Sequence, residues 1–140
     1  MIENVDAVQN FLAEVKLLLS EKGRCSINNS PWVGKANKTQ LYMAETGLTI
    51  SDVKEVIKKL TVKNYCATKD DRNPNFPNEQ IWEFGIRKKI CDDEEDFYIK
   101  LKIRKIEQNY LLIMSFHPEQ PFTEAEKLEF PYKDYEEEKE

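Results

Sequence analysis

Apolar residues recur at helical spacing in the N-terminal part of the chain. Asp6 stands where it can cap a helix, and Gly23 can take the left-handed conformation that ends one. The apolar positions between them that predict an amphipathic helix are Val8, Phe11, Leu12, Val15, Leu18 and Leu19. Residues 24–27 can form a short strand, and a second helix is predicted over residues 38–46, ending at Gly47.

A capping box predicts the start of a third helix. Thr49 and Asp52 have the spacing at which each side chain caps the backbone of the other. The apolar residues that follow at i, i+3, i+4 and i+7 are Val53, Val56, Ile57 and Leu60. The N-terminal part of the chain is therefore predicted to be helical.

After Leu60 the pattern changes to the twofold alternation of strands. Residues 61–80 contain prolines and turn formers, so they are predicted to be a polar surface loop, preceded at most by a short extended piece. Segments 79–90, 97–106 and 110–117 alternate or are apolar throughout, which predicts an antiparallel meander. We expect an α+β fold with N-terminal helices packed on one face of a small antiparallel β-sheet.

The chain length of 140 residues suits one domain, which we expect to span residues 1–118. Residues 119–140 are expected to be an acidic, partly disordered extension, with a short helix after a Thr123–Glu126 capping box and no folded structure in residues 135–140. Residues 124–140 of this extension carry the net charge of −5, and residues 1–123 are balanced. A local basic surface that binds a polyanion is therefore compatible with the acidic composition.

Cellular location and cofactors are also constrained by the composition. The N-terminus has no signal-like segment and no apolar run is long enough to span a membrane, so a cytoplasmic protein is expected. Three widely spaced cysteines indicate reduced thiols. With one histidine and no C-x-x-C pair, neither a metal nor another cofactor is expected.

Four polar residues of segment 97–106 share one face of the predicted sheet. They are Tyr98, Lys100, Lys102 and Arg104. An antiparallel sheet with one wet side often carries basic residues for solubility alone. The functional alternative is a cationic surface that binds RNA phosphates, with Tyr98 available for stacking or hydrogen bonding. Spacing does not decide between these two readings.

His117 ends the last predicted strand, with the same parity as Ile113 and Ser115. A lone histidine is more often a structural or surface residue, but an unperturbed pKa near 6.5 suits proton transfer. Metal-independent RNA cleavage needs a base for the 2′-hydroxyl group, an acid for the leaving oxygen and a cation. His117, Glu83 or Tyr98, and Lys100 can fill these roles, although strand parity does not fix register between strands. A plain ion pair with Arg87 on the same strand face is the simpler role for Glu83.

The order of four motifs resembles the motility quorum-sensing regulator family of toxins, MqsR, which are RelE-like ribonucleases of type II toxin–antitoxin systems. The motifs are GLTISDVKEVIKKLTVKNY, IWEFG, YIKLKI and LLIMSFH, and the resemblance covers about residues 8–118. It implies a RelE-like fold, cleavage of mRNA, free or ribosome-bound, and a cognate antitoxin that holds the toxin inactive.

The resemblance also implies which residues form the active face. Tyr98 matches the family tyrosine, Lys100 the lysine of the same strand motif, and His117 the basic residue after Ser-Phe. Cys66 stands at a family lysine and Glu83 at a family glutamine, so two positions have changed chemistry. Lys63 or Lys69 can supply the missing cation, and Lys69, Arg87, Lys102 and Arg104 are the expected RNA-binding residues.

Two alternatives stay open at this point. The same sheet face can belong to a non-catalytic module that binds an acidic protein partner, because a shared fold does not guarantee activity. The acidic extension can shield the basic face, or it can simply keep the protein soluble.

Overall fold

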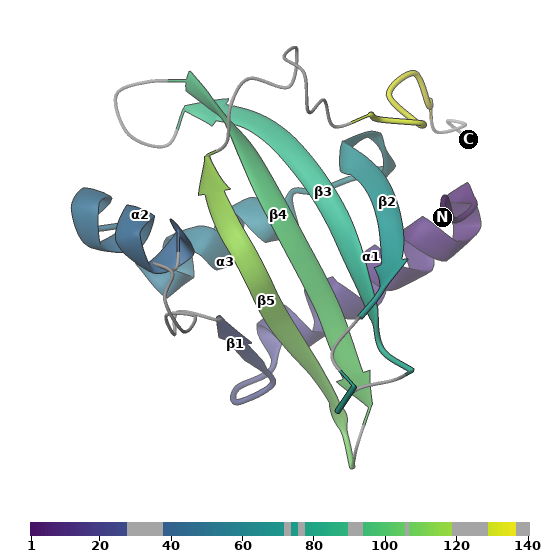
Figure 1. Ribbon diagram of the computed structural model, residues 1–140, viewed down its shortest axis with the longest axis horizontal. Helices are drawn as coiled ribbons and strands as arrows, with labels where there is room; N and C mark the ends of the chain where they lie inside the picture. Colours follow the sequence, from purple (N-terminus) through teal and green to yellow (C-terminus); the bar gives the residue numbers. More distant parts are fainter. Residues whose placement is uncertain are drawn as a thin grey trace.

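A computed structural model of the chain describes residues 1–27, 38–71, 74–75, 78–89, 94–105, 107–118 and 129–136. The elements are α1 (Val5–Ser20), β1 (Cys25–Ile27), α2 (Lys38–Thr46), α3 (Ile50–Lys58), the 3-10 turn η1 (Val62–Asn64), β2 (Tyr65–Asp70), β3 (Gln80–Lys89), β4 (Glu94–Lys105) and β5 (Asn109–Pro118). The predicted α+β fold with N-terminal helices is confirmed (Figure 1).

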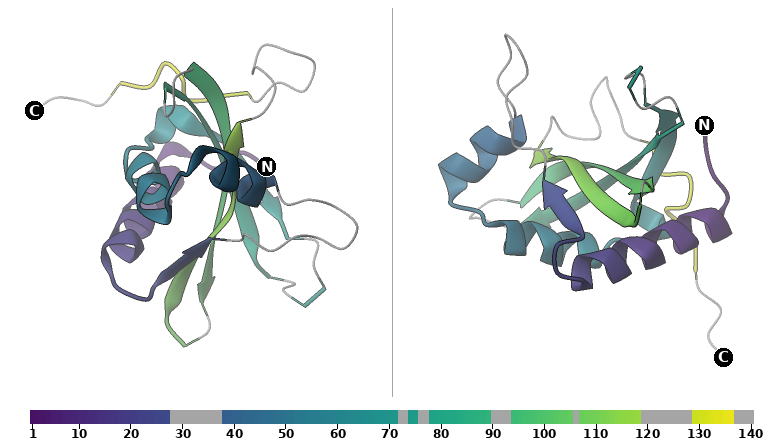
Figure 2. Two further views of the ribbon diagram at one scale, coloured as in Figure 1. Left: turned by 90° about the vertical axis from the view of Figure 1, so that its left-hand side faces the viewer. Right: turned by 90° about the horizontal axis from the view of Figure 1, so that it is seen from below.

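Within the described residues, all strands belong to one sheet in the order β1-β5-β4-β3-β2. Strands β2 to β5 form an antiparallel meander, as predicted, whereas β1 pairs in parallel with β5. Helices α1 and α3 lie against one face of this sheet, which we call the core face (Figure 2). The opposite face, which we call the outer face, carries the polar residues of β4.

The core forms where aromatic side chains of α1 and the sheet meet. Phe11 stacks on Trp82 with ring centroids 4.2 Å apart and meets Phe84 edge-on at 6.1 Å. Ile99 and Leu101 of β4 are fully buried beneath the helices. Each such side chain contributes about 1.5–3 kcal/mol when it leaves water, so the helices and the sheet stabilise each other.

The predicted helix ends hold with two corrections, both at α1. The helix ends at Ser20 with an extended cap at Glu21, so Gly23, although its φ is +78°, lies beyond the end of the helix. The cap of α1 is Asn4, whose Oδ1 accepts a hydrogen bond from the backbone N–H of Ala7 at 2.8 Å. Asp6 lies in the first turn, where a negative charge favours the positive end of the helix dipole. The Thr49–Asp52 capping box of α3 is present. Gly47 follows α2 with φ +71°, and its N–H bonds to Met43.

Strand β2 lies in a segment that was predicted to be mostly a surface loop. Tyr65 at its start is fully buried, and its hydroxyl group lies 2.7 Å from Thr68 Oγ1 and accepts from Glu3 N at 3.0 Å. The short extended piece that the sequence allowed before the predicted loop is therefore this strand, whose exposed end is Lys69 and Asp70.

Residues 129–136 of the acidic extension pack on the body of the protein. Tyr132 stacks on Tyr65 with centroids 6.1 Å apart, and its hydroxyl group donates to the carbonyl of Glu3 at 2.5 Å. Gln9 Nε2 donates to Tyr135 at 3.4 Å, although no folded structure was predicted there. This part of the extension therefore lies beside the start of α1, away from the polar outer face (Figure 2). The predicted Thr123–Glu126 capping box lies outside the described residues.

Candidate active site on the outer face of the sheet

Tyr98 is the centre of a polar cluster on the outer face. Its hydroxyl group donates a hydrogen bond to the Glu83 carboxylate on β3. The His117 ring on β5 lies 6.2 Å from the Tyr98 ring, and Lys100 Nζ lies 5.2 Å from the centroid of that ring. We call Glu83, Tyr98, Lys100 and His117 the Tyr98 cluster. The sequence had named these residues without establishing their register, and the structure brings them together.

A β-bulge in β5 gives His117 its position. Lys100 pairs with Ser115 but Leu101 pairs with Ile113, so Met114 is an extra residue on β5. By plain alternation His117 would share the core face with Ile113. Because the bulge shifts the alternation by one residue, His117 pairs with Tyr98 and faces outward.

His117 is largely buried and its ring is hydrogen-bonded to the backbone. The residue exposes 7% of its surface, and its Nδ1 lies 3.2 Å from the carbonyl oxygen of Pro118. A hydrogen bond between Nδ1 and a backbone carbonyl group orients the imidazole ring. The ring is thus held in a fixed orientation next to Tyr98.

Glu83 is a buried carboxylate with two different partners. It exposes only 3% of its surface; Oε2 accepts from the Tyr98 hydroxyl group, and Oε1 lies 2.9 Å from Lys69 Nζ on β2. A buried carboxylate is costly unless it is paired in this way. The interpretation that Glu83 pairs with Arg87 was wrong, because Lys69 takes that role.

Arg87 pairs across the strands with Asp96 instead. Its Nε and Nη2 donate to the two oxygens of Asp96 at 2.6 and 2.9 Å. Hydrogen bonding to Asp96 raises the pKa of the Arg87 guanidinium above its ordinary value. Arg87 lies on the outer face as expected, but its charge is largely matched by Asp96.

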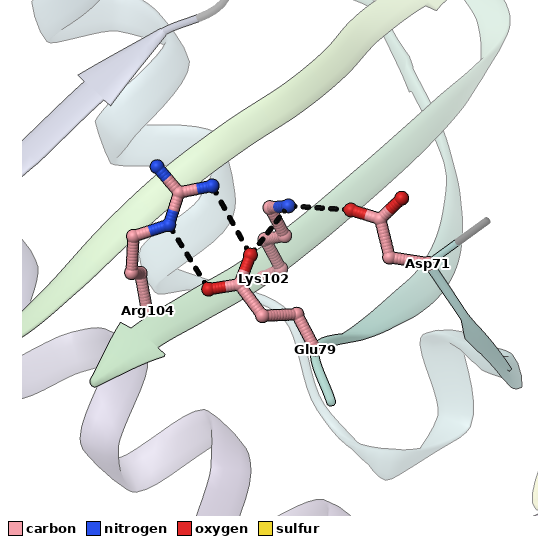
Figure 3. Close-up of polar contacts among 4 residues, drawn as sticks. All are labelled: Asp71, Glu79, Lys102 and Arg104. Atoms are coloured by element: carbon pink, nitrogen blue, oxygen red, sulfur yellow. Dashed lines mark hydrogen bonds and ion pairs between the residues drawn. The ribbon is translucent and has the colours of Figure 1, made fainter. Parts of the chain in front are cut away.

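Lys102 and Arg104 also lie on the outer face but are engaged in an ion-pair network (Figure 3). Lys102 exposes 2% of its surface, and its Nζ binds Asp71 at 2.5 Å and Glu79 at 2.8 Å. Arg104 makes two hydrogen bonds to Glu79 at 2.9 and 3.1 Å. An RNA phosphate would have to compete with these carboxylates. The open cationic strip expected from alternation is therefore reduced to its Lys100 end.

Cys66 occupies the bulge of β2, where Tyr65 pairs with Phe84 and Ala67 with Glu83. The residue is buried, which raises the pKa of its thiol to about 12, with the negative charge of Glu83 adding to the effect. The thiol is therefore neutral at physiological pH and cannot replace a lysine as a cation.

Sequence reasoning missed the carboxylates that neutralise the basic residues. Asp71 and Glu79 flank the β2–β3 connection, and the Asp71 N–H donates to the Glu79 carbonyl at 2.9 Å. Asp96 lies inside β4, in register with Arg87. Asp96 has the same parity as Tyr98, and Asp71 and Glu79 lie beside a predicted turn. These features indicate ion pairing only weakly, because the sequence does not fix which strands are neighbours.

The described residues form neither a metal-binding cluster nor a membrane-spanning helix. No group of three or more His, Cys, Asp and Glu side chains there is arranged to hold a metal ion. No helix in the described ranges has the length and apolar character needed to cross a membrane.

Comparison with known proteins gives one match. A family model described as "Motility quorum-sensing regulator, toxin of MqsA" matches residues 12–118, which include the whole Tyr98 cluster. No curated protein and no solved structure matches the chain.

Proposed function

Since the chain belongs to the motility quorum-sensing regulator family of toxins, we propose that it cleaves mRNA at the Tyr98 cluster without a metal ion. The family places the chain in a toxin–antitoxin system, in which the partner is an antitoxin of the MqsA kind. One observation carries the enzymatic proposal. Tyr98 lies next to a base on β3 (Glu83), a cation on β4 (Lys100) and an acid on β5 (His117).

RNA brings its own nucleophile to such a site. The 2′-oxygen attacks the neighbouring phosphorus while the bond from phosphorus to the 5′-oxygen breaks, which leaves a 2′,3′-cyclic phosphate and a 5′-hydroxyl group. The enzyme has to accept the proton of the 2′-hydroxyl group, donate one to the 5′-oxygen and stabilise the charge of the phosphorane.

Glu83, Tyr98 and His117 supply the two proton transfers. The Tyr98 hydroxyl group already donates to Glu83, so it can accept the 2′-hydroxyl proton while passing its own proton to the carboxylate. His117 lies on the other side of Tyr98, where its imidazolium form donates a proton to the leaving 5′-oxygen. The proposed base, the Tyr98 hydroxyl group, and the proposed acid, the His117 ring, thus lie next to each other on adjacent strands.

Lys100 and Lys69 are the proposed cations. Lys100 reaches over the Tyr98 ring, and Lys69 exposes 64% of its side chain while holding Glu83. Arg87, Lys102 and Arg104 are weaker RNA-binding candidates because each is already paired with a carboxylate.

The two positions that depart from the family motif are linked through Lys69. A lysine is missing at Cys66, and a carboxylate stands at Glu83 instead of an amide. The Glu83–Lys69 ion pair brings a cation from three residues further along β2 into the same cluster. This pairing supports a retained activity with altered chemistry.

The direct test uses a defined single-stranded RNA and the purified protein in EDTA. The proposal expects cuts with a 2′,3′-cyclic phosphate end, and no cut at a position made 2′-deoxy. Translating ribosomes, which need Mg²⁺, are added without EDTA in a second arm to reveal a ribosome requirement. Loss of cleavage in EDTA, or no cleavage in either arm, would contradict it.

A second candidate function is a non-catalytic module that binds a protein partner through the outer face. The burial of His117 and the ion pairing of Lys102 favour this reading. It predicts a soluble protein that neither cuts RNA nor arrests growth when it is produced alone.

A further inference from the structure

A groove lies between α1 and the end of the sheet where β3 begins and β4 ends. Its volume is about 600 Å³, and it shares no residue with the Tyr98 cluster. Nothing in the proposed reaction uses it. Its lining combines an apolar floor with a polar rim, which is the general composition of a recognition site.

The floor is aromatic and rigid. Phe11 from α1 and Trp82 from β3 stack at 4.2 Å with planes 7° apart, and both line the groove. Ile103 of β4 continues the apolar surface. A bound apolar side chain would meet a preformed surface and would not have to order it.

The rim carries negative charge at both ends. Glu3 and Glu14 both line the groove, and no ion pair joins either of them to a basic residue in the described ranges. A third carboxylate, Glu79, is already matched by Lys102 and Arg104. Lys105 is the basic residue of the described lining. The groove therefore attracts a basic ligand and repels a polyanion.

Groove length and polar groups indicate an extended peptide. From the cap of α1 at Asn4 to Glu14 the helix rises about 15 Å, which an extended segment of about five residues matches. Asn10 and Gln80 also line the groove. Their amides offer both donors and acceptors to the backbone of such a segment.

We infer that this groove binds an extended segment of the antitoxin, with a basic residue at each end and an apolar residue between them. The inference rests on the proposed toxin function, for which it names a contact with the partner. Charge argues against the other occupants, because RNA phosphates and the acidic residues 136–140 would both face Glu3 and Glu14.

The test compares two double variants that change net charge equally. Glu3→Lys with Glu14→Lys reverses the rim, and Glu45→Lys with Glu107→Lys changes exposed carboxylates elsewhere. Affinity for a purified antitoxin of the MqsA kind is measured by calorimetry, after circular dichroism shows that each variant is folded. We expect the rim variant to bind at least tenfold more weakly and the control to stay within twofold of wild type. Ala7→Phe, which narrows the groove without changing charge, should weaken binding in the same direction.

Several results would overturn the inference. They are wild-type affinity in the rim variant, an equal loss in the control variant, or no binding of the antitoxin by the wild type. Tighter RNA binding by the wild type than by a protein with Ala7→Phe would instead make the groove an RNA site. RNA cleavage is assayed separately on each protein, so that a failure of the ribonuclease proposal is distinguished from a failure of the groove.

Discussion

Tyr98 on β4 and His117 on β5 are directly opposite each other in the sheet register, and their ring centroids lie 6.2 Å apart. This relationship depends on the bulge at Met114, which turns His117 away from the core face. Because Glu83 and Lys100 meet the same tyrosine, Tyr98 joins the proposed base, acid and cation.

Tyr98→Phe should strongly reduce RNA cleavage and only slightly reduce the stability of the fold. The change removes one hydroxyl group that donates to Glu83, while Lys69 still neutralises the carboxylate. We expect RNA cleavage to fall by about 100-fold or more, as for the loss of a general acid–base group. The free energy of unfolding should fall by only about 1 kcal/mol. Tyr110→Phe on the same face is the matched control and should retain full activity; equal losses in both variants would remove Tyr98 from the reaction.

Lys69→Met should weaken RNA binding, and Lys63→Met should not. Lys69 holds Glu83 in the cluster at 2.9 Å, whereas Lys63 lies in η1 and makes no ion pair with another described residue. If Lys69 contacts one phosphate, its loss should reduce the salt dependence of RNA binding by about one unit of slope. Fluorescence anisotropy at several salt concentrations measures this slope. Identical slopes for wild type and Lys69→Met would exclude a phosphate contact.

Lys102→Met should destabilise the fold and leave RNA binding unchanged. The substitution leaves Asp71 and Glu79 without their shared buried cation, which should cost about 3–5 kcal/mol in the free energy of unfolding. Lys105→Met, at an exposed position of the same strand, should change stability by at most about 0.5 kcal/mol. Urea denaturation measures both. A specific loss of RNA affinity in Lys102→Met would show that the network opens when RNA binds.

Glu79 should make the fold sensitive to acid. Its hydrogen bonds from Arg104, and then those from Lys102, hold its pKa below the ordinary value of 4.5. The folded carboxyl group therefore takes up a proton less readily than the unfolded one, so its contribution to stability is present above pH 4.5 and is lost as pH falls through the folded pKa. Glu79→Gln should be less stable at neutral pH and should lose less stability on acidification. Unfolding free energies measured from about pH 3 to 7 test this; an unchanged acid slope would contradict it.

Much of the fold could be predicted because the sequence patterns of helices and strands depend on neighbouring residues. The stripe from Val8 to Leu19 and the Thr49–Asp52 box each depend on neighbouring residues only. Strand β2 was predicted only as an optional short extended piece, because its exposed end is polar and its buried residues, Tyr65, Cys66 and Thr68, do not alternate regularly. The parallel pairing of β1 with β5 depends on contacts between distant segments, which periodicity does not encode.

The residues of the candidate site could be predicted from the sequence, but their geometry could not. Alternation places Tyr98, Lys100, Lys102 and Arg104 on one face, and the structure agrees. It does not reveal the Met114 bulge that brings His117 to that face. Nor does it reveal that Asp71 and Glu79 neutralise Lys102. Register and ion pairing arise from the tertiary fold. The alternation of basic residues in β4 therefore overestimated the positive charge that is available on the outer face.

The most direct test of the proposed ribonuclease activity compares cells that produce the wild-type protein with cells that produce His117→Ala. Each protein is induced from a tightly controlled promoter, and RNA ends are mapped by primer extension. Ser115→Ala, at the position that pairs with Lys100 on the same strand, is the matched control. We predict growth arrest and discrete new RNA ends with the wild type and with Ser115→Ala, and neither effect with His117→Ala at equal soluble expression. Undiminished cleavage by His117→Ala, or soluble wild-type protein that neither cuts RNA nor slows growth, would contradict it.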